Sequence, residues 1–263
     1  MATMTAMPVT TATPPRDGYR FGNVARMEWI KLRSLRSTWW TLAFAAAGAV
    51  GIGTAVGVET KGTSGDLTNN VLSGVALGLL VTGVLGALVM SSEYGSGLIR
   101  TTLTAIPNRR LLLAAKAATF CAVALVIGEL ASFLSFAAGS IAITARHLTG
   151  PSLTDPAVVR AVLLAGVGYL LIGLMGMGIG AIVRHSSAAV GVLVGVVYVL
   201  GQVIGGVFSA AMGYVPISLV ANSMSTVKRL PHAPDPWVGL AVLSFYAAIV
   251  LGVGGWLLTR RDA

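Results

Sequence analysis

Charged residues are scarce in this chain. Only 10% of its 263 residues are Asp, Glu, Lys or Arg, 55% are hydrophobic, and the mean hydropathy is +0.83. This composition lies well outside the range of soluble domains, so it indicates a polytopic membrane protein. We expect an all-α fold in which residues 21–263 form a single transmembrane domain.

Cysteine and histidine are nearly absent. The single cysteine, Cys121, has no partner for an intrachain disulfide. Of the three histidines, His147 and His232 are predicted on the outer side of the membrane and His185 on the cytoplasmic side, so they cannot share one metal site. No serine is predicted to share a face with a histidine and an acid, and acids or histidines are not paired at one membrane face. The sequence therefore favours neither a metal site nor a membrane enzyme.

A phosphate-binding loop is missing as well. The sequence contains no Gly-Lys dipeptide, so it lacks the G-x-x-x-x-G-K-[ST] pattern that cradles nucleotide phosphates. It also has no predicted soluble domain that could fold such a loop. If ATP drives this protein, another chain must bind it.

Long apolar runs dominate what is present. A hydrocarbon core of about 30 Å requires about 20 helical residues at about 1.5 Å each. Six runs satisfy this length, and the third of them contains one acid, Glu129. The predicted spans are about 39–58, 71–90, 117–143, 161–183, 186–212 and 237–259.

The cations are distributed unequally between the two sides of these spans. The net charge is +9, from 18 Lys and Arg against 9 Asp and Glu. One side carries most of the cations: Arg16, Arg20, Arg26, Lys31, Arg33, Arg36, Arg100, Arg109, Arg110, Lys116, Arg184, Arg260 and Arg261. The other side carries Lys61, Arg146, Arg160, Lys228 and Arg229. The positive-inside rule therefore places both termini in the cytoplasm, and membrane orientation explains the charge better than nucleic-acid binding does.

Residues 1–20 have a different character. They carry no early cations before an apolar stretch and contain Pro14 and Pro15. This composition predicts a disordered cytoplasmic tail and no cleaved signal peptide.

The fifth run is followed by an uncharged segment. No charge occurs from Ser186 to Val227, although Gly213 and Pro216 break the helical pattern. We expect residues 213–227 either to re-enter the membrane or to lie along its outer surface, buried by protein in a packed cap.

Glycines recur at four-residue spacing in the spans. Small residues on one helical face allow two backbones to approach closely, so these pairs predict packing seams within the chain or, alternatively, a subunit interface. The pairs are Gly74 and Gly78, Gly176 and Gly180, Gly191 and Gly195, and Gly201 and Gly205.

The segment before the first span, "RFGNVARMEWIKLRSLRSTWW", is moderately amphipathic. As a helix it places Arg26, Arg33 and Arg36 on one side, while its apolar side holds Val24, Met27 and Leu35 and is interrupted by Lys31 and Glu28. Trp29, Trp39 and Trp40 would lie at headgroup depth. The segment therefore reads as an interfacial anchor on membrane lipid, or as a docking surface for a cytoplasmic partner.

The connection after the second span holds a second short helix. Gly95 and Gly97 should end the span, and Pro107 and Asn108 should end the short helix. Its predicted apolar stripe is Leu98, Thr102 and Ile106, with Leu103 nearby. A helix of one or two turns is not stable alone in water, so it must pack against something.

Together, "EWIKLRSLRSTWWTL" and "SSEYGSGLIRTTLTAIPNRRLLLAAK" resemble the permease subunits of ABC-2 type transporters, particularly the six-span kind common in actinobacteria. The resemblance implies a multi-pass protein of the bacterial plasma membrane, paired with a second permease copy or a relative. A separate ABC ATPase would bind ATP and Mg, and this chain would bind no cofactor. The resemblance assigns ATPase docking to Glu28, Lys31, Arg33, Glu93, Tyr94, Gly97 and Arg100. It also implies export of a hydrophobic or amphipathic substrate such as a drug, an antibiotic or a lipid.

The roles of two polar residues inside the spans stay open. An ionised acid in mid-membrane costs at least about 2.5 kcal/mol, so Glu129 either lines a substrate pathway, carries protons or has a structural role. Gln202 is expected to form an interhelical hydrogen bond. An ion-coupled secondary transporter that uses Glu129 is the alternative to an ABC permease.

Overall fold

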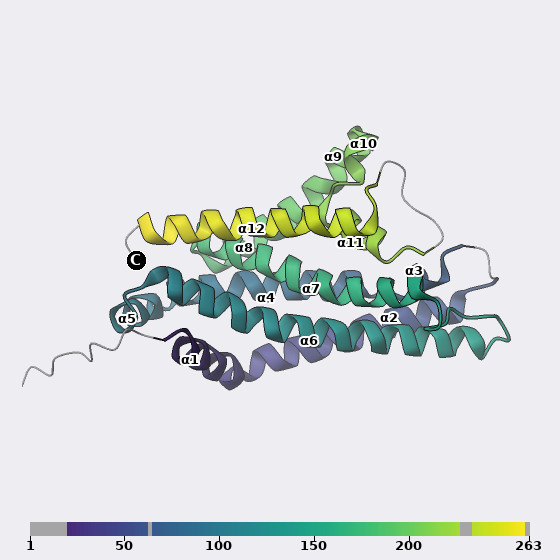
Figure 1. The fold of residues 1–263 in the computed structure, drawn as a ribbon, viewed down its shortest axis with the longest axis horizontal. Coiled ribbons are helices and arrows are strands. Elements are labelled where there is room, and N and C mark those ends of the chain that lie inside the picture. Colours follow the sequence, from purple (N-terminus) through teal and green to yellow (C-terminus); the bar gives the residue numbers. More distant parts are fainter. Residues whose placement is uncertain (1–19, 63–64, 227–232, 261–263) are drawn as a thin grey trace, which may run out of the picture.

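The computed structural model is an elongated bundle of helices whose long axes run nearly together (Figure 1). It describes residues 20–62, 65–226 and 233–260, and these residues form helices but no strand. Six of the helical stretches are long and apolar enough to cross a membrane. The predicted all-α, six-span fold is confirmed. Residues 1–19 of the predicted tail, and the outer cations Lys228 and Arg229, lie outside the described residues.

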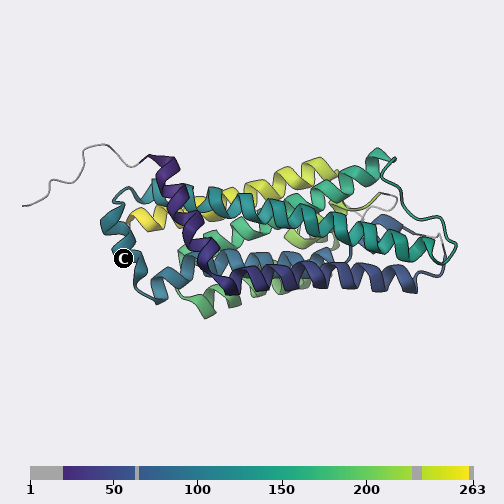
Figure 2. The same ribbon diagram turned by 90° about the horizontal axis from the view of Figure 1, so that it is seen from below.

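The helices follow one another with short connections. They are α1 (Phe21–Ser34), α2 (Arg36–Glu59), α3 (Leu67–Val71), α4 (Val75–Gly95), α5 (Leu98–Ala105), α6 (Arg109–Thr144), α7 (Pro156–Val183), α8 (Ser186–Leu193), the π-helix η1 (Val194–Leu200), α9 (Gly201–Val207), α10 (Ser209–Met212), α11 (Pro216–Ser223) and α12 (Pro236–Arg260). We call the end of the bundle that holds α1, α5 and the end of α12 the α5 end, and the opposite end, with α3, the α3 end (Figures 1 and 2).

The fourth span, α7, is the centre of the bundle because α4, α6 and α12 all pack against it. Its glycines allow this close approach. A Cβ at Gly176 would lie 2.0 Å from the carbonyl oxygen of Gly83 on α4, and a Cβ at Gly86 would lie 2.0 Å from that of Gly173. Only glycine fits such backbone contacts.

Two of the four predicted glycine pairs form packing seams within the chain, and the alternative of a subunit interface stays a prediction for the others. The pairs at Gly74 and Gly78 and at Gly176 and Gly180 are packing seams, since a Cβ at each would overlap a neighbouring helix. By contrast, Gly191 and Gly195 face open space among the described residues. Gly201 and Gly205 contact Val215 and Met212, close by in the chain.

The fifth span departs from a straight helix. After α8 the chain turns into the π-helix η1, α9 follows, and the backbone breaks at Phe208, short of the predicted end at residue 212. Figure 1 shows α9 and α10 leaning away from the rest of the bundle. π-Helices are rare and are often found at functional sites.

The segment after this span is packed, as expected for backbone that protein must bury. α11 contacts α7 and α12, and Leu219 and Asn222 are buried. Asn222 Nδ2 donates to the carbonyl oxygen of Pro234 at 2.7 Å. Arg160 of α7 donates to the carbonyl oxygens of Ser223 and Ser225 at 3.1 and 2.9 Å.

Candidate functional site

The α5 end brings together the two segments singled out in the sequence. Figure 2 shows α1 lying obliquely across the bundle before the chain turns into α2. The turn is at Leu35, which has an extended backbone and is 52% exposed. Leu35 was predicted on the apolar side of α1, and this prediction is wrong because the helix ends one residue earlier. The buried side of α1 consists of Val24, Glu28 and Leu32.

Glu28 is buried because it meets a lysine from a distant helix. Nζ of Lys116, on α6, lies 2.6 Å from Oε2 of Glu28 and 2.8 Å from Oε1 of Glu93, which is on α4. Nζ of Lys31 lies 3.1 Å from Oε1 of Glu93 and 3.3 Å from Oε1 of Glu28. We call these four residues the ionic cluster. Two acids and two lysines balance each other in charge, and together they join α1, α4 and α6.

The two lysines of the ionic cluster differ in exposure. The side chain of Lys116 is 3% exposed, whereas that of Lys31 is 35% exposed. Burial works against the charge of Lys31, but the nearby carboxylates of Glu28 and Glu93 outweigh it and raise the pKa of Lys31 above its ordinary value of 10.5. Lys31 also donates to Oγ1 of Thr102 at 3.4 Å, which links the ionic cluster to α5.

The short helix α5 packs against this assembly. It begins after Gly97, whose φ of 72° is a left-handed conformation that glycine adopts readily. Ile99, Thr102 and Ile106 are buried, and Ile106 joins a small core with Val24 of α1. The predicted stripe was right at Thr102 and Ile106 but wrong at Leu98, which is 52% exposed.

The other side of α5 faces outward. Arg100, Thr101, Thr104 and Ala105 are all exposed. Thr101 and Thr104 turn their hydroxyls back onto the carbonyl oxygens of Leu98 and Thr101 at 2.9 and 2.8 Å. The exposed face of the helix thus carries one cationic side chain, Arg100.

Two arginines tie the last helix into the same end. Arg109 Nη1 donates to the carbonyl oxygen of Leu258 at 2.7 Å, and Arg184 Nη2 donates to that of Leu257 at 3.2 Å. Cations at a helix C-terminus satisfy its free carbonyls and its dipole. The guanidinium of Arg184 also stacks 4.9 Å from the ring centroid of Tyr94, so α4, α7 and α12 meet there.

The structure separates the predicted docking residues into two groups. Glu28, Lys31 and Glu93 lie together inside the ionic cluster, and Tyr94 lies beside Arg184. By contrast, Arg33, Gly97 and Arg100 are exposed at the α5 end. Sequence reasoning missed Lys116, which it counted only as one of the inner cations. The available signal was its position next to the third apolar run, where a lone lysine needs a partner.

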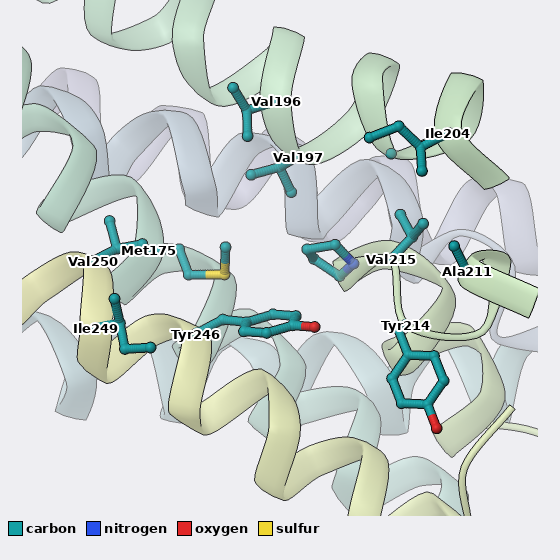
Figure 3. Close-up of a pocket in the computed structure, with 12 residues that line it drawn as sticks. Met175, Val196, Val197, Ile204, Ala211, Tyr214, Val215, Tyr246, Ile249 and Val250 are labelled. Carbon is teal, nitrogen blue, oxygen red and sulfur yellow. The ribbon is translucent and has the colours of Figure 1, made fainter. Parts of the chain in front are cut away.

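Two cavities accompany these elements. One, of about 440 Å³, lies beside the ionic cluster and is lined by Glu93, Lys116, Leu32 and Leu98 among others. The other, of about 380 Å³, lies where the fifth span leaves the bundle. Figure 3 shows Val197 of η1, Met175 of α7 and Tyr246 of α12 facing this second space, which is almost wholly apolar.

The two intramembrane candidates lie apart from the α5 end and from each other. Glu129 is on α6, half-buried against α7. Gln202 is on α9 and exposed, and its side chain makes no hydrogen bond with the described residues. Within the described ranges, no group of three or more His, Cys, Asp or Glu is placed to hold a metal ion.

Comparison with known families agrees with this architecture. The family model described as "ABC-2 family transporter protein" matches residues 25–202, which is more than half of the chain. The matched region begins in α1, includes α5 and the whole ionic cluster, and ends in α9. A search among curated proteins finds no match. The chain therefore belongs to the ABC-2 family of membrane transport proteins.

Proposed function

We propose that this chain is the permease subunit of an ATP-driven exporter, and that a separate ABC ATPase binds its α5 end. ABC-2 proteins are membrane components that in general work with an ATPase subunit. The proposal adds where the ATPase binds, on which side of the membrane, and in which direction the substrate moves.

The observation that carries the proposal is the two-sided character of α5. Ile99, Thr102 and Ile106 are buried against the bundle, while Arg100, Thr101, Thr104 and Ala105 are exposed. A helix of eight residues cannot be stable alone, so its exposed face is available only because the bundle supports it. Such a supported, exposed face is what a partner needs in order to push on the spans.

The ionic cluster supplies the mechanical link in this proposal. It connects α1, α4 and α6 through salt bridges of 2.6 to 3.3 Å, and Lys31 extends the link to α5. When ATP draws two ATPase subunits together, α1 and α5 would therefore move as one body with the spans that they join. ATP and Mg would be bound and used in the partner chain, so this subunit would be non-catalytic.

Charge distribution supports the orientation. Arg33, Arg36, Arg100 and Arg110 are exposed at the α5 end. Because cytoplasmic segments are enriched in Lys and Arg, we place the α5 end and both termini in the cytoplasm and the protein in the plasma membrane. Trp29 and Trp40 are also exposed there and would contact membrane lipid.

The substrate in this proposal is hydrophobic or amphipathic. The pocket in Figure 3 lies between the diverging fifth span and α12, and its lining is aliphatic and aromatic, with Tyr214 and Tyr246 supplying hydroxyls. Apolar cavities with a few polar groups are typical ligand sites. A second permease copy, or a related permease, would complete the enclosure of the pathway.

Co-purification tests the proposal. Where an ABC ATPase is encoded beside the gene, the chain is expressed with that ATPase, and an Arg100→Glu variant is compared with Lys61→Glu, a charge reversal on an exposed residue at the α3 end. We expect Arg100→Glu to lose most of the bound ATPase and most of the ATP hydrolysis. Full assembly and turnover in Arg100→Glu would refute docking on α5.

An ion-coupled transporter that uses Glu129 is the alternative function. The observation in its favour is that the Glu129 carboxyl has no partner among the described residues. Uptake or export by vesicles that hold this chain without an ATPase, driven by a proton gradient and lost in Glu129→Gln, would establish it.

A further inference from the structure

Glu129 lies near the middle of the longest helix. It is 13 residues from Lys116 in the ionic cluster and 15 residues from Thr144, where α6 ends. At 1.5 Å per residue these separations are about 20 and about 22 Å. The carboxyl is therefore far from both membrane surfaces.

The carboxyl lies at a close approach of α6 and α7. A Cβ at Gly128 would lie 2.8 Å from the carbonyl oxygen of Gly166, so the two backbones nearly touch. A Cβ at Gly166 would lie 2.3 Å from Cδ of Glu129. The carboxyl thus rests on the bare backbone of Gly166, in space that any larger residue would fill.

No described residue satisfies this carboxyl. Its Oε2 is buried without a hydrogen-bond partner, and Glu129 forms no ion pair with the described residues. Glu28 and Glu93 differ, since each accepts from both lysines of the ionic cluster. Among the described residues, these three acids lie inside the bundle and not in its loops. Glu129 is the one of the three that forms no ion pair with a described lysine or arginine.

The side chains around the carboxyl are apolar and exposed. Val126 and Leu130 on α6 and Leu163 on α7 are exposed, and each lies within about one helical turn of Glu129 or Gly166. A bound molecule could therefore place an apolar body along these side chains and one polar group on the carboxyl. When the carboxyl is ionised, the missing group must be a hydrogen-bond donor, because an ionised carboxylate only accepts.

An ammonium group satisfies this requirement best. An isolated ionised acid is unfavourable at this depth, and pairing with a cation offsets that cost. We propose that Glu129, whose carboxyl rests on Gly166, binds the ammonium group of amphipathic amines, and that these are the substrate class. This inference rests on the proposed exporter function and deepens it.

Binding to the permease alone tests the site without any ATPase. The chain is placed in lipid nanodiscs, with empty nanodiscs as the background, and fluorescence anisotropy follows two probes. Dansylcadaverine carries a primary ammonium, and its N-acetyl derivative keeps the fluorophore and linker but is neutral. We expect the chain to prefer the amine by roughly tenfold or more in Kd.

Substitutions of the acid then identify the contact. Glu129→Gln should abolish the preference, so that both probes bind alike, whereas Glu129→Asp keeps the charge and should keep a preference. An unchanged preference in Glu129→Gln would overturn the proposal. A loss of binding for both probes together would also overturn it, because that result means a structural role.

A second variant moves the carboxyl without removing it. Gly166→Ala pushes on the far end of a flexible side chain, so it should fold while displacing the carboxyl from its place against residue 166, and the amine preference should fall. Gly252→Ala is the matched control, because a Cβ there meets nothing within 4 Å. Equal preferences in the two alanine variants would contradict the placement of the site.

The size of the complex separates this proposal from a subunit contact. If Glu129 instead pairs with a donor of a second copy, Glu129→Gln will convert dimers to monomers in detergent, and the amine proposal fails. If the amine preference is present but no ATPase co-purifies, the site stands and the proposed exporter function fails.

Discussion

Lys116 and Glu28 are 88 residues apart in the chain, yet Nζ of Lys116 lies 2.6 Å from Oε2 of Glu28, and both side chains are almost fully buried. This contact fixes the interfacial helix α1 to the third span. Buried ion pairs contribute little net stability when compared with apolar residues, but removing one partner leaves an uncompensated charge. The contact therefore serves to hold α1 in one position.

Removal of the central lysine should be costly. Lys116→Met leaves two buried carboxylates with only Lys31 to share, so we expect a loss of about 3–5 kcal/mol in the free energy of unfolding. Lys31→Met should cost clearly less, because the Lys31 side chain is 35% exposed and water can replace it. Denaturant unfolding in detergent measures both. Equal losses in the two variants would show that burial of Lys116 is not what matters.

The stability contributed by Lys31 should depend on pH in the alkaline range. The pKa of Lys31 is raised in the folded chain, since the carboxylates of Glu28 and Glu93 outweigh burial. Its contribution is therefore fully present below the unfolded pKa and is lost as pH rises through the higher folded value. Above about pH 10.5, a plot of melting temperature against pH should fall more steeply for the wild type than for Lys31→Met. Parallel curves would contradict this link.

The glycine seam between α4 and α7 should not tolerate a methyl group. A Cβ at Gly176 would overlap the backbone carbonyl of Gly83, and backbone cannot move aside as a side chain can. We expect Gly176→Ala to lose about 1–3 kcal/mol. Gly191→Ala, in open space on α8, should leave stability unchanged or slightly raised. A harmless Gly176→Ala would mean that these helices lie farther apart.

Because Glu93 lies inside the ionic cluster, a charge reversal there tests the stability of the fold and not ATPase docking. Glu93→Lys would gather three lysines around Glu28 and should disrupt the ionic cluster, so its effect on ATPase binding would be indirect. The exposed Arg100 is the cleaner probe of docking. Its reversal should leave the melting temperature of the isolated chain within about 2 °C of the wild type, whereas Glu93→Lys should lower it by several degrees. Thermal melts of the two variants decide between these outcomes.

The spans were predictable because lipid imposes a simple length requirement on apolar helices. The ionic cluster was not, since no local pattern pairs Glu28 with a lysine 88 residues away. The first position of the α5 stripe was mispredicted, since Leu98 is exposed and its neighbour Ile99 is buried, which one turn of apolar residues beside a glycine does not reveal in the sequence. The π-helix in the fifth span also leaves no sequence signal, because its residues are as apolar as the helix before it.

The side of the membrane on which α5 lies is the claim on which the proposed function depends. Thr104→Cys on the exposed face of α5, in a Cys121→Ala background, gives one accessible thiol. A membrane-impermeant maleimide should label it in inside-out vesicles and leave it unlabelled in intact cells. Labelling of residue 104 in intact cells would place α5 outside, where no cytoplasmic ATPase could bind it.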